Sequence, residues 1–95
     1  MPILQIEHGV GDYDAWKRAF DSDPLGREES GVRRYRIVRT IDDPNLVAVD
    51  LEFDSVEEAQ TFRLRLLDLW GLMEDQLGLA DATARVVETA EVQDY

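Results

Sequence analysis

The chain has 95 residues, a formal net charge of -11 and no cysteine. A chain of this length forms one domain and buries only about 60–65% of its unfolded surface, so a partner subunit would add stability. The acidic balance opposes binding to nucleic acid and to anionic membranes, because both need a positive protein surface. Without cysteine there are no disulfides, thiolate nucleophiles or thiolate metal sites.

We expect a single domain over residues 1–95 in the cytoplasm, with no membrane partner. The chain opens without a basic and apolar signal segment. No run approaches the roughly 18 apolar residues of a membrane span.

The first part of the chain predicts a strand followed by a helix. Residues 1–9 alternate, with Leu4, Ile6 and His8 on one side, which is the pattern of a half-buried strand. Asp12 is a suitable N-cap for a helix through about residue 21. The apolar face of that helix is Tyr13, Trp16, Ala19 and Phe20. Residues 23–31 are polar and interrupt the pattern, so a helical turn at 25–29 stays undecided.

Residues 32–41 and 46–54 alternate again and predict a hairpin, because the intervening Asp42-Asp43-Pro44-Asn45 has the chemistry of a turn. The register must keep Val49 and Leu51 in the core beside Tyr35 and Ile37, since a slip of one residue would turn the set outward. Arg36 then lies opposite Asp50, and Arg34 opposite Glu52.

Residues 55–77 predict the longest helix, which begins with a capping box formed by Ser55 and Glu58. Spacings of three and four place a core stripe on one face: Val56, Ala59, Phe62, Leu66, Leu69, Met73 and Leu77. Four apolar residues fall outside that stripe and need another cover: Leu64, Leu67, Trp70 and Leu72. Gly78 is a plausible helix stop. A last strand is expected from residue 82 to about 92.

The element order βαββαβ predicts an α+β, ferredoxin-like fold, with two helices on one face of a four-stranded antiparallel sheet. The strand ending in His8, the segments DYDAWKRAFD and GVRRYRIVRTIDDPN, and the segment VAVDLEFDSVEEAQTF together resemble the small dimeric α/β-barrel proteins. That superfamily includes antibiotic-biosynthesis monooxygenase-like and stress-responsive barrel domains, and the resemblance covers nearly the whole chain. It implies a homodimer whose two sheets face each other in a barrel, in some members with a pocket for an organic substrate.

His8, the only histidine, is the candidate catalytic residue, because its pKa range suits a general base. A strand-end histidine satisfied by its surroundings is the commoner case. It has no spaced His or Cys partners, so no metal site is predicted, and no cofactor is expected. Trp16 is a candidate ligand contact, although core packing also explains its spacing. Trp70 lies off the core stripe and suits an interface or the rim of a pocket.

The face that carries Arg34, Arg36 and Asp50 has two interpretations. Cross-strand ion pairs are usually structural and contribute about 0.2–1 kcal/mol each. Inside a dimeric barrel, the same arginines could instead bind a carboxylate or phosphate on a ligand.

Two functions from different classes follow. The first is a cofactor-free, monooxygenase-like enzyme or binding protein for a small organic molecule, with a pocket near His8, Trp16 and Arg36. The second is a non-catalytic dimeric module for structure or interaction. A pocket of about 300 Å³ or more with convergent polar groups would favour the first, whereas a barrel interior closed by ion pairs would favour the second.

Overall fold

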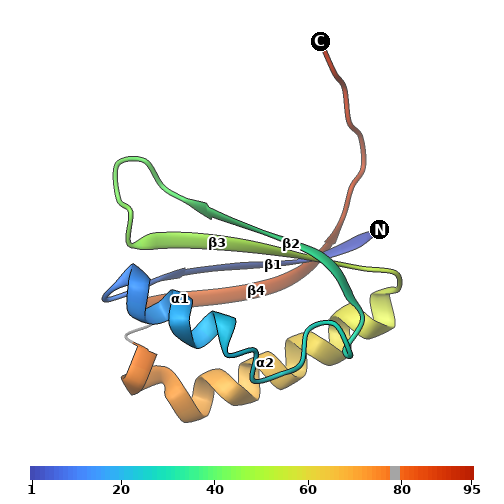
Figure 1. Ribbon diagram of the computed structural model, residues 1–95. Coiled ribbons are helices and arrows are strands. Elements are labelled where there is room, and N and C mark those ends of the chain that lie inside the picture. Colours follow the sequence, from blue (N-terminus) through green and yellow to red (C-terminus); the bar gives the residue numbers. More distant parts are fainter. Residues whose placement is uncertain (78–79) are drawn as a thin grey trace.

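The computed structural model describes the backbone of residues 1–77 and 80–95 and the side chains of residues 1–72 and 82–95. Its elements follow the expected order: β1 (Pro2–Gly9), α1 (Tyr13–Asp21), β2 (Val32–Arg39), β3 (Leu46–Phe53), α2 (Val56–Leu77) and β4 (Ala80–Glu88). The last strand begins and ends earlier than the expected 82–92. It ends at residue 88 because residues 89–95 leave the sheet (Figure 1). The proposed helix stop at Gly78 lies outside the described residues.

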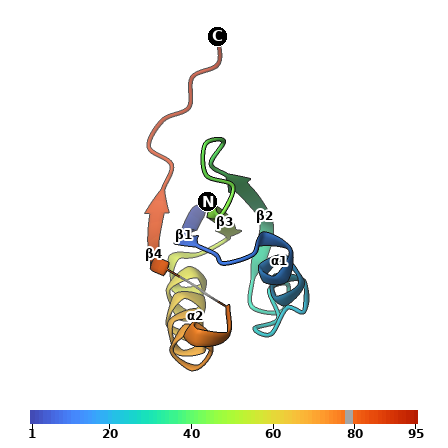
Figure 2. The same ribbon diagram turned by 90° about the vertical axis from the view of Figure 1, so that its left-hand side faces the viewer.

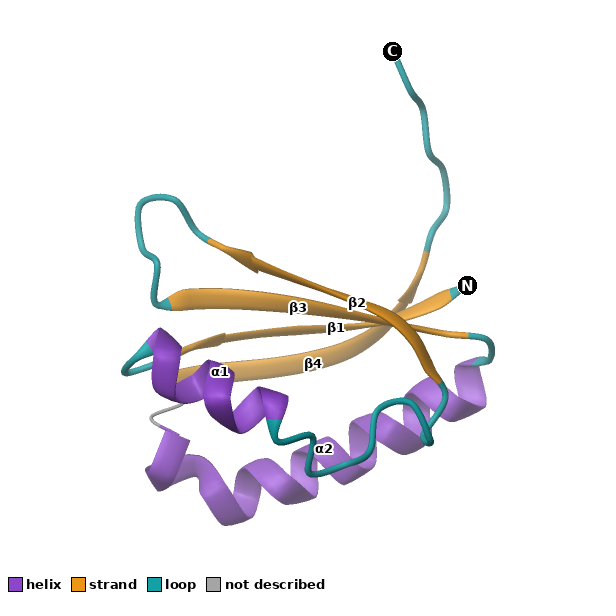
Figure 3. Ribbon diagram, viewed as in Figure 1, coloured by secondary structure: helices purple, strands orange, loops and turns teal. Residues whose placement is uncertain are grey.

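The strands form one antiparallel sheet in the order β2-β3-β1-β4. Both helices cover the same face, and the other face is open in this chain (Figures 1 and 3). Figure 2 shows α1 beneath the β2 side of the sheet and α2 beneath the β4 side. This is the ferredoxin-like α+β fold that the sequence predicted. Neither described helix combines the length and hydrophobicity needed to span a membrane.

The core lies between the sheet and the helices, as the alternating patterns predict. Leu4 and Ile6 of β1 point into it, and β3 alternates between buried and half-buried residues along its whole length. Its buried apolar members are Leu4, Ile6, Val10, Trp16, Val32, Val47, Val49, Leu51, Phe53, Ala59 and Phe62. Tyr35 and Val56 were expected in the core, but they remain 43% and 53% exposed. Val56 is the first residue of α2. Tyr35 lies on the edge strand β2, where it makes an aromatic contact with the ring of Phe20 from the short helix α1.

Local capping fixes where both helices begin. The Asp12 carboxylate accepts a hydrogen bond from the backbone N–H of Asp14 (3.3 Å), as expected of an N-cap. At the start of α2, Ser55 Oγ accepts from the backbone N–H of Glu58 (3.2 Å). The Glu58 carboxylate accepts the Ser55 hydroxyl (2.9 Å) rather than the Ser55 backbone N–H, so the capping box is present in a modified form. Residues 25–29, which stayed undecided, contain turns and no α-helix.

Candidate ligand pocket

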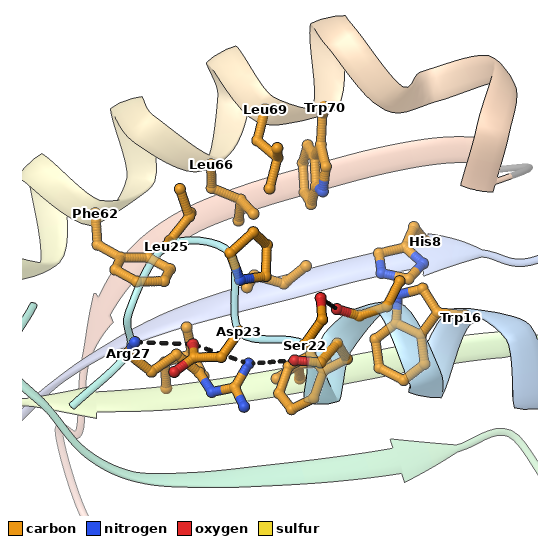
Figure 4. Close-up of a pocket in the computed structure, with 16 residues that line it drawn as sticks. His8, Trp16, Ser22, Asp23, Leu25, Arg27, Phe62, Leu66, Leu69 and Trp70 are labelled. Carbon is orange, nitrogen blue, oxygen red and sulfur yellow. Dashed lines mark hydrogen bonds and ion pairs between the residues drawn. The ribbon is translucent and has the colours of Figure 1, made fainter. Parts of the chain in front are cut away.

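A pocket of about 130 Å³ lies between the sheet, α1, α2 and the loop that follows α1 (Figure 4). Its walls are mostly apolar, and its lining residues come from five parts of the chain. They are Ile6, His8, Trp16, Ala19, Phe20, Ser22, Asp23, Pro24, Leu25, Arg27, Val49, Leu51, Phe62, Leu66, Leu69 and Trp70. The volume is below the roughly 300 Å³ typical of sites for drug-sized ligands. The pocket therefore does not reach the size that was expected to favour the binding function, and it suits only a small ligand.

His8 lies at the end of β1 on the inner face of the sheet and is only 2% exposed. Its ring centroid is 5.4 Å from that of Trp16 and 6.0 Å from that of Trp70, and both contacts are edge-to-face. Figure 4 shows the imidazole between the two indoles. The alternation of β1 turns His8 inward, while α1 and α2 each supply one tryptophan. The structure therefore brings together three of the six candidate site residues.

One ring nitrogen of His8 is not satisfied by the protein. The Nδ1 atom is buried and has no hydrogen-bond partner among the described residues. Burial lowers the pKa of His8 below its ordinary value of 6.5, because desolvation disfavours the charged ring. The side chain is therefore neutral at pH 7, with one ring nitrogen free to accept a proton or hydrogen bond. An unpaired buried polar group costs about 1–3 kcal/mol, so this atom calls for an explanation beyond core packing.

Arg27 lies at the other end of the pocket, in the loop between α1 and β2 (Figure 4). Its Nη1 donates to the carbonyl oxygen of Phe20 (2.8 Å) and lies 3.5 Å from Asp23 Oδ1. The guanidinium also stacks on the Phe20 ring, 3.9 Å from its centroid. Sequence reasoning missed Asp23, Leu25 and Arg27, because this loop has no periodicity. The available signal was Arg27 itself, a basic residue in a turn whose other residues are uncharged or acidic.

The other three candidate site residues, Arg34, Arg36 and Asp50, lie on the open face of the sheet. The expected register is confirmed, with Arg36 paired to Asp50 and Arg34 to Glu52. Arg36 Nη2 lies 3.0 Å from Asp50 Oδ2, and Arg34 forms an ion pair with Glu52.

The expectation that Arg36 lies near His8 is therefore wrong. Adjacent strand residues point to opposite faces, so the register that buries Val49 turns its neighbour Asp50, and with it Arg36, away from the pocket. The arginine side chains on this face are 76% and 73% exposed in the single chain, where such pairs contribute little stability.

Comparisons with known proteins bear on the fold. No family model and no curated protein sequence matches the chain. Among solved structures, SnoaB of Streptomyces nogalater, a cofactor-independent oxygenase, superposes with a TM-score of 0.71 at 13% identity, covering 96% of this chain and 94% of that one. A candidate antibiotic biosynthesis monooxygenase of Deinococcus radiodurans superposes with a TM-score of 0.66 at 11% identity, covering 100% and 98%.

A third similar structure is described as a dimeric ferredoxin-like protein from an uncultured marine organism. It has a TM-score of 0.66 and 10% identity over 97% of both chains. At these identities the comparison concerns the fold. The resemblance found in the sequence is thus confirmed at that level: the chain has the ferredoxin-like fold of antibiotic-biosynthesis monooxygenase-like proteins.

Proposed function

We propose that this protein binds a small aromatic molecule carrying a hydroxyl group in the pocket between sheet and helices, and that neutral His8 accepts the hydroxyl proton. The observation that carries this proposal is the buried Nδ1 of His8, which lacks a partner among the described residues. Because His8 lines the pocket, a rotation of the imidazole that turns Nδ1 toward the cavity would let a ligand hydroxyl satisfy this atom. The lowered pKa of His8 supports the same role, because only the neutral ring can accept.

The surroundings of His8 favour an aromatic ligand. Trp16 and Trp70 present ring surfaces on either side of the imidazole, and aromatic pairs are favoured beyond their buried area. The pocket of about 130 Å³ is close in size to an apolar protein cavity of roughly 150 Å³ that takes up benzene. One aromatic ring therefore fits the enclosed part, and larger substituents would extend toward the pocket mouth.

Removal of the hydroxyl proton makes an aromatic ring more electron-rich, so an easily oxidised substrate could then react with dioxygen as the second reactant. The O–H bond and the ring C–H bond para to it break, and a new C–O bond forms. One oxygen atom of dioxygen becomes the second carbonyl of a quinone, and the other leaves as water. No cofactor takes part in this scheme. The similar fold of a cofactor-independent oxygenase supports it.

The binding part is tested with phenol and toluene, which differ only by a hydroxyl in place of a methyl group. Titration calorimetry should show that wild type binds phenol about tenfold more tightly, because one hydrogen bond to a buried group contributes roughly 1–1.5 kcal/mol. His8→Phe keeps a ring but removes Nδ1, so it should retain toluene binding and lose the preference. The only two tryptophans flank His8, so tryptophan fluorescence should change when either ligand binds.

Equal affinity for phenol and toluene in wild type would contradict the proposal, as would an unchanged preference in His8→Phe. The oxygenase part is tested separately, by oxygen uptake with 2-methoxyphenol, an electron-rich phenol of one ring that carries hydrogen at the position para to its hydroxyl. His8→Phe should reduce the rate by about 100-fold, within the usual contribution of a general base.

We also propose a homodimer in which the open sheet faces of two chains stack. The open face supports this assembly, because it carries both arginines and carboxylates. The arginines of one copy could therefore also pair with the carboxylates of the other. Two structures of the same fold are described as dimeric. If ligand binding is absent, these ion pairs favour the second candidate function, a non-catalytic dimeric module. Light scattering at micromolar concentration should give twice the chain mass of 10.9 kDa, and a monomer there would exclude the dimer.

A stacked dimer of this kind would not shield the apolar residues of α2 that lie outside the core stripe. Leu64 and Leu72 are 60% and 81% exposed, and α2 lies on the opposite side of the sheet from the open face (Figure 3). The two surfaces therefore lie on opposite sides of the chain, and one interface cannot cover both.

A further inference from the structure

We infer that Arg27 selects ligands with a negatively charged group, so that the substrate class is an aromatic hydroxy acid. The inference rests on the proposed function, in which His8 binds the hydroxyl end of the ligand. It adds a second fixed point at the other end of the pocket. Figure 4 shows His8 and Arg27 at opposite ends of the lining, with Leu66 and Leu69 of α2 along the wall between them. A ligand that matches this arrangement is polar at both ends and apolar in the middle.

The guanidinium of Arg27 is held in position before any ligand arrives. Its side chain is only 17% exposed, and it stacks on Phe20 at 3.9 Å and approaches the ring of Tyr35 at 5.2 Å. The bond from Nη1 to the Phe20 carbonyl fixes its rotation. A cation immobilised in this way loses little conformational entropy when it binds a ligand, which favours affinity.

Part of the donor capacity of Arg27 stays available for a ligand. A guanidinium carries five N–H donors, and the polar contacts of this side chain with the described residues all involve Nη1. The edge formed by Nε and Nη2 can therefore still hold a carboxylate through two parallel hydrogen bonds. A neutral amide cannot accept in the same bidentate, charge-assisted way.

Asp23 forms an ion pair with Arg27 on the Nη1 side of the guanidinium and leaves the edge formed by Nε and Nη2 available. Its Oδ1 lies 3.5 Å from Nη1, beyond the usual distance for a charge-assisted hydrogen bond. The same oxygen accepts the backbone N–H of Arg27 at 2.9 Å. Asp23 thus holds the loop in shape, while Arg27 is the one basic residue among those that line the pocket. In a chain of net charge -11, a buried anionic ligand depends on such a local cation.

The experiment compares 3-hydroxyphenylacetate with 3-hydroxyphenylacetamide, which have the same shape, differ in charge and carry hydrogen at the ring position para to the hydroxyl, as the proposed oxidation requires. Titration calorimetry of wild type should show the acid binding at least about tenfold more tightly than the amide, as expected for a charge-assisted pair. Arg27→Gln should lose this preference while the affinity for the amide stays within a few fold. The matched control is Arg65→Gln, because Arg65 also bonds to this loop, at the Leu25 carbonyl and Ser30 Oγ, from outside the pocket lining. It should keep the preference.

The outcomes separate the two proposals. If wild type binds the amide in a His8-dependent way but binds the acid no better, the pocket is confirmed and the role of Arg27 is overturned. The same conclusion follows if Arg27→Gln weakens both ligands equally, because that is the signature of a structural role. If wild type binds neither compound, both proposals fail. The wild-type comparison of acid and amide remains decisive even if Arg27→Gln does not fold.

Discussion

The two faces of the sheet differ in the burial and pairing of their polar side chains. On the helix side, His8 is buried between two indoles, and its Nδ1 has no partner among the described residues. On the open side, Arg34 and Arg36 are exposed, and each pairs with a carboxylate on the neighbouring strand. A paired surface charge is explained by the fold alone, whereas a buried ring nitrogen without a partner is not. The difference directs the search for function to the helix side.

The comparison also predicts where changes should be costly. Groups on the helix side exclude water, so removing them creates cavities or exposes unsatisfied atoms. In a single chain, groups on the open side can be replaced by water at little cost. The predictions below run from the largest expected effect to the smallest.

Trp16→Ala should lower the free energy of unfolding by about 3–5 kcal/mol, the usual range for a buried aromatic residue replaced by alanine. Trp16 is 6% exposed and contacts His8, Tyr13 and Phe20. Urea denaturation followed by circular dichroism measures the loss, with the exposed Leu72→Ala as the control that should change little. Wild-type stability together with lost binding of phenol would show that Trp16 serves the ligand and not the core.

Acidification should destabilise the wild type more than His8→Phe. Burial lowers the folded-state pKa of His8 below 6.5, so below that pH the unfolded chain binds the proton first. The free energy of unfolding therefore falls as the pH drops from 6.5 toward the folded-state pKa. Urea titrations of both proteins at several pH values between 7.5 and 5 would measure this difference. Parallel curves would mean that His8 titrates as a solvated residue, and the contrast between the two faces would disappear.

Ligand binding should also depend on the protonation of His8, because protonated His8 can no longer accept the hydroxyl proton. The affinity of wild type for phenol relative to toluene should decline as the pH falls through the lowered pKa. Asp23 and Arg27 are the other charged residues that line the pocket. Their contribution is removed by repeating the titration with His8→Phe, whose relative affinity should not change with pH.

The smallest effect is expected on the open face. A double-mutant cycle of Arg36→Ala and Asp50→Ala should give a coupling of about 0.2–1 kcal/mol, which high salt should reduce because the pair is exposed. Coupling within the error of about 0.3–0.5 kcal/mol, combined with loss of ligand-induced thermal stabilisation in Arg36→Ala, would reverse the assignment. The open face would then be the binding surface.

Local patterns in the sequence were enough to predict the elements and the pairing within the hairpin. Alternation in β1 and β3 predicted which of their residues face the core, and the hairpin register predicted the pairing of Arg36 with Asp50. In β2, most residues are exposed, because it is an edge strand. The capping residues Asp12 and Ser55 marked both helix starts. These features are local, because they depend on residues a few positions apart or on a register that burial enforces.

The set of residues that forms the pocket could not be predicted from the sequence. His8, Trp16, Arg27 and Trp70 come from a strand, a helix, a loop and a second helix, and no spacing in the sequence relates them. The sequence argument assigned Arg36 to the pocket and overlooked Arg27, because charge alone does not reveal the face on which a side chain lies. The missing partner of His8 is also a tertiary property. It depends on every residue that packing places around the ring, and two of these, Trp16 and Trp70, lie 8 and 62 positions away in the sequence.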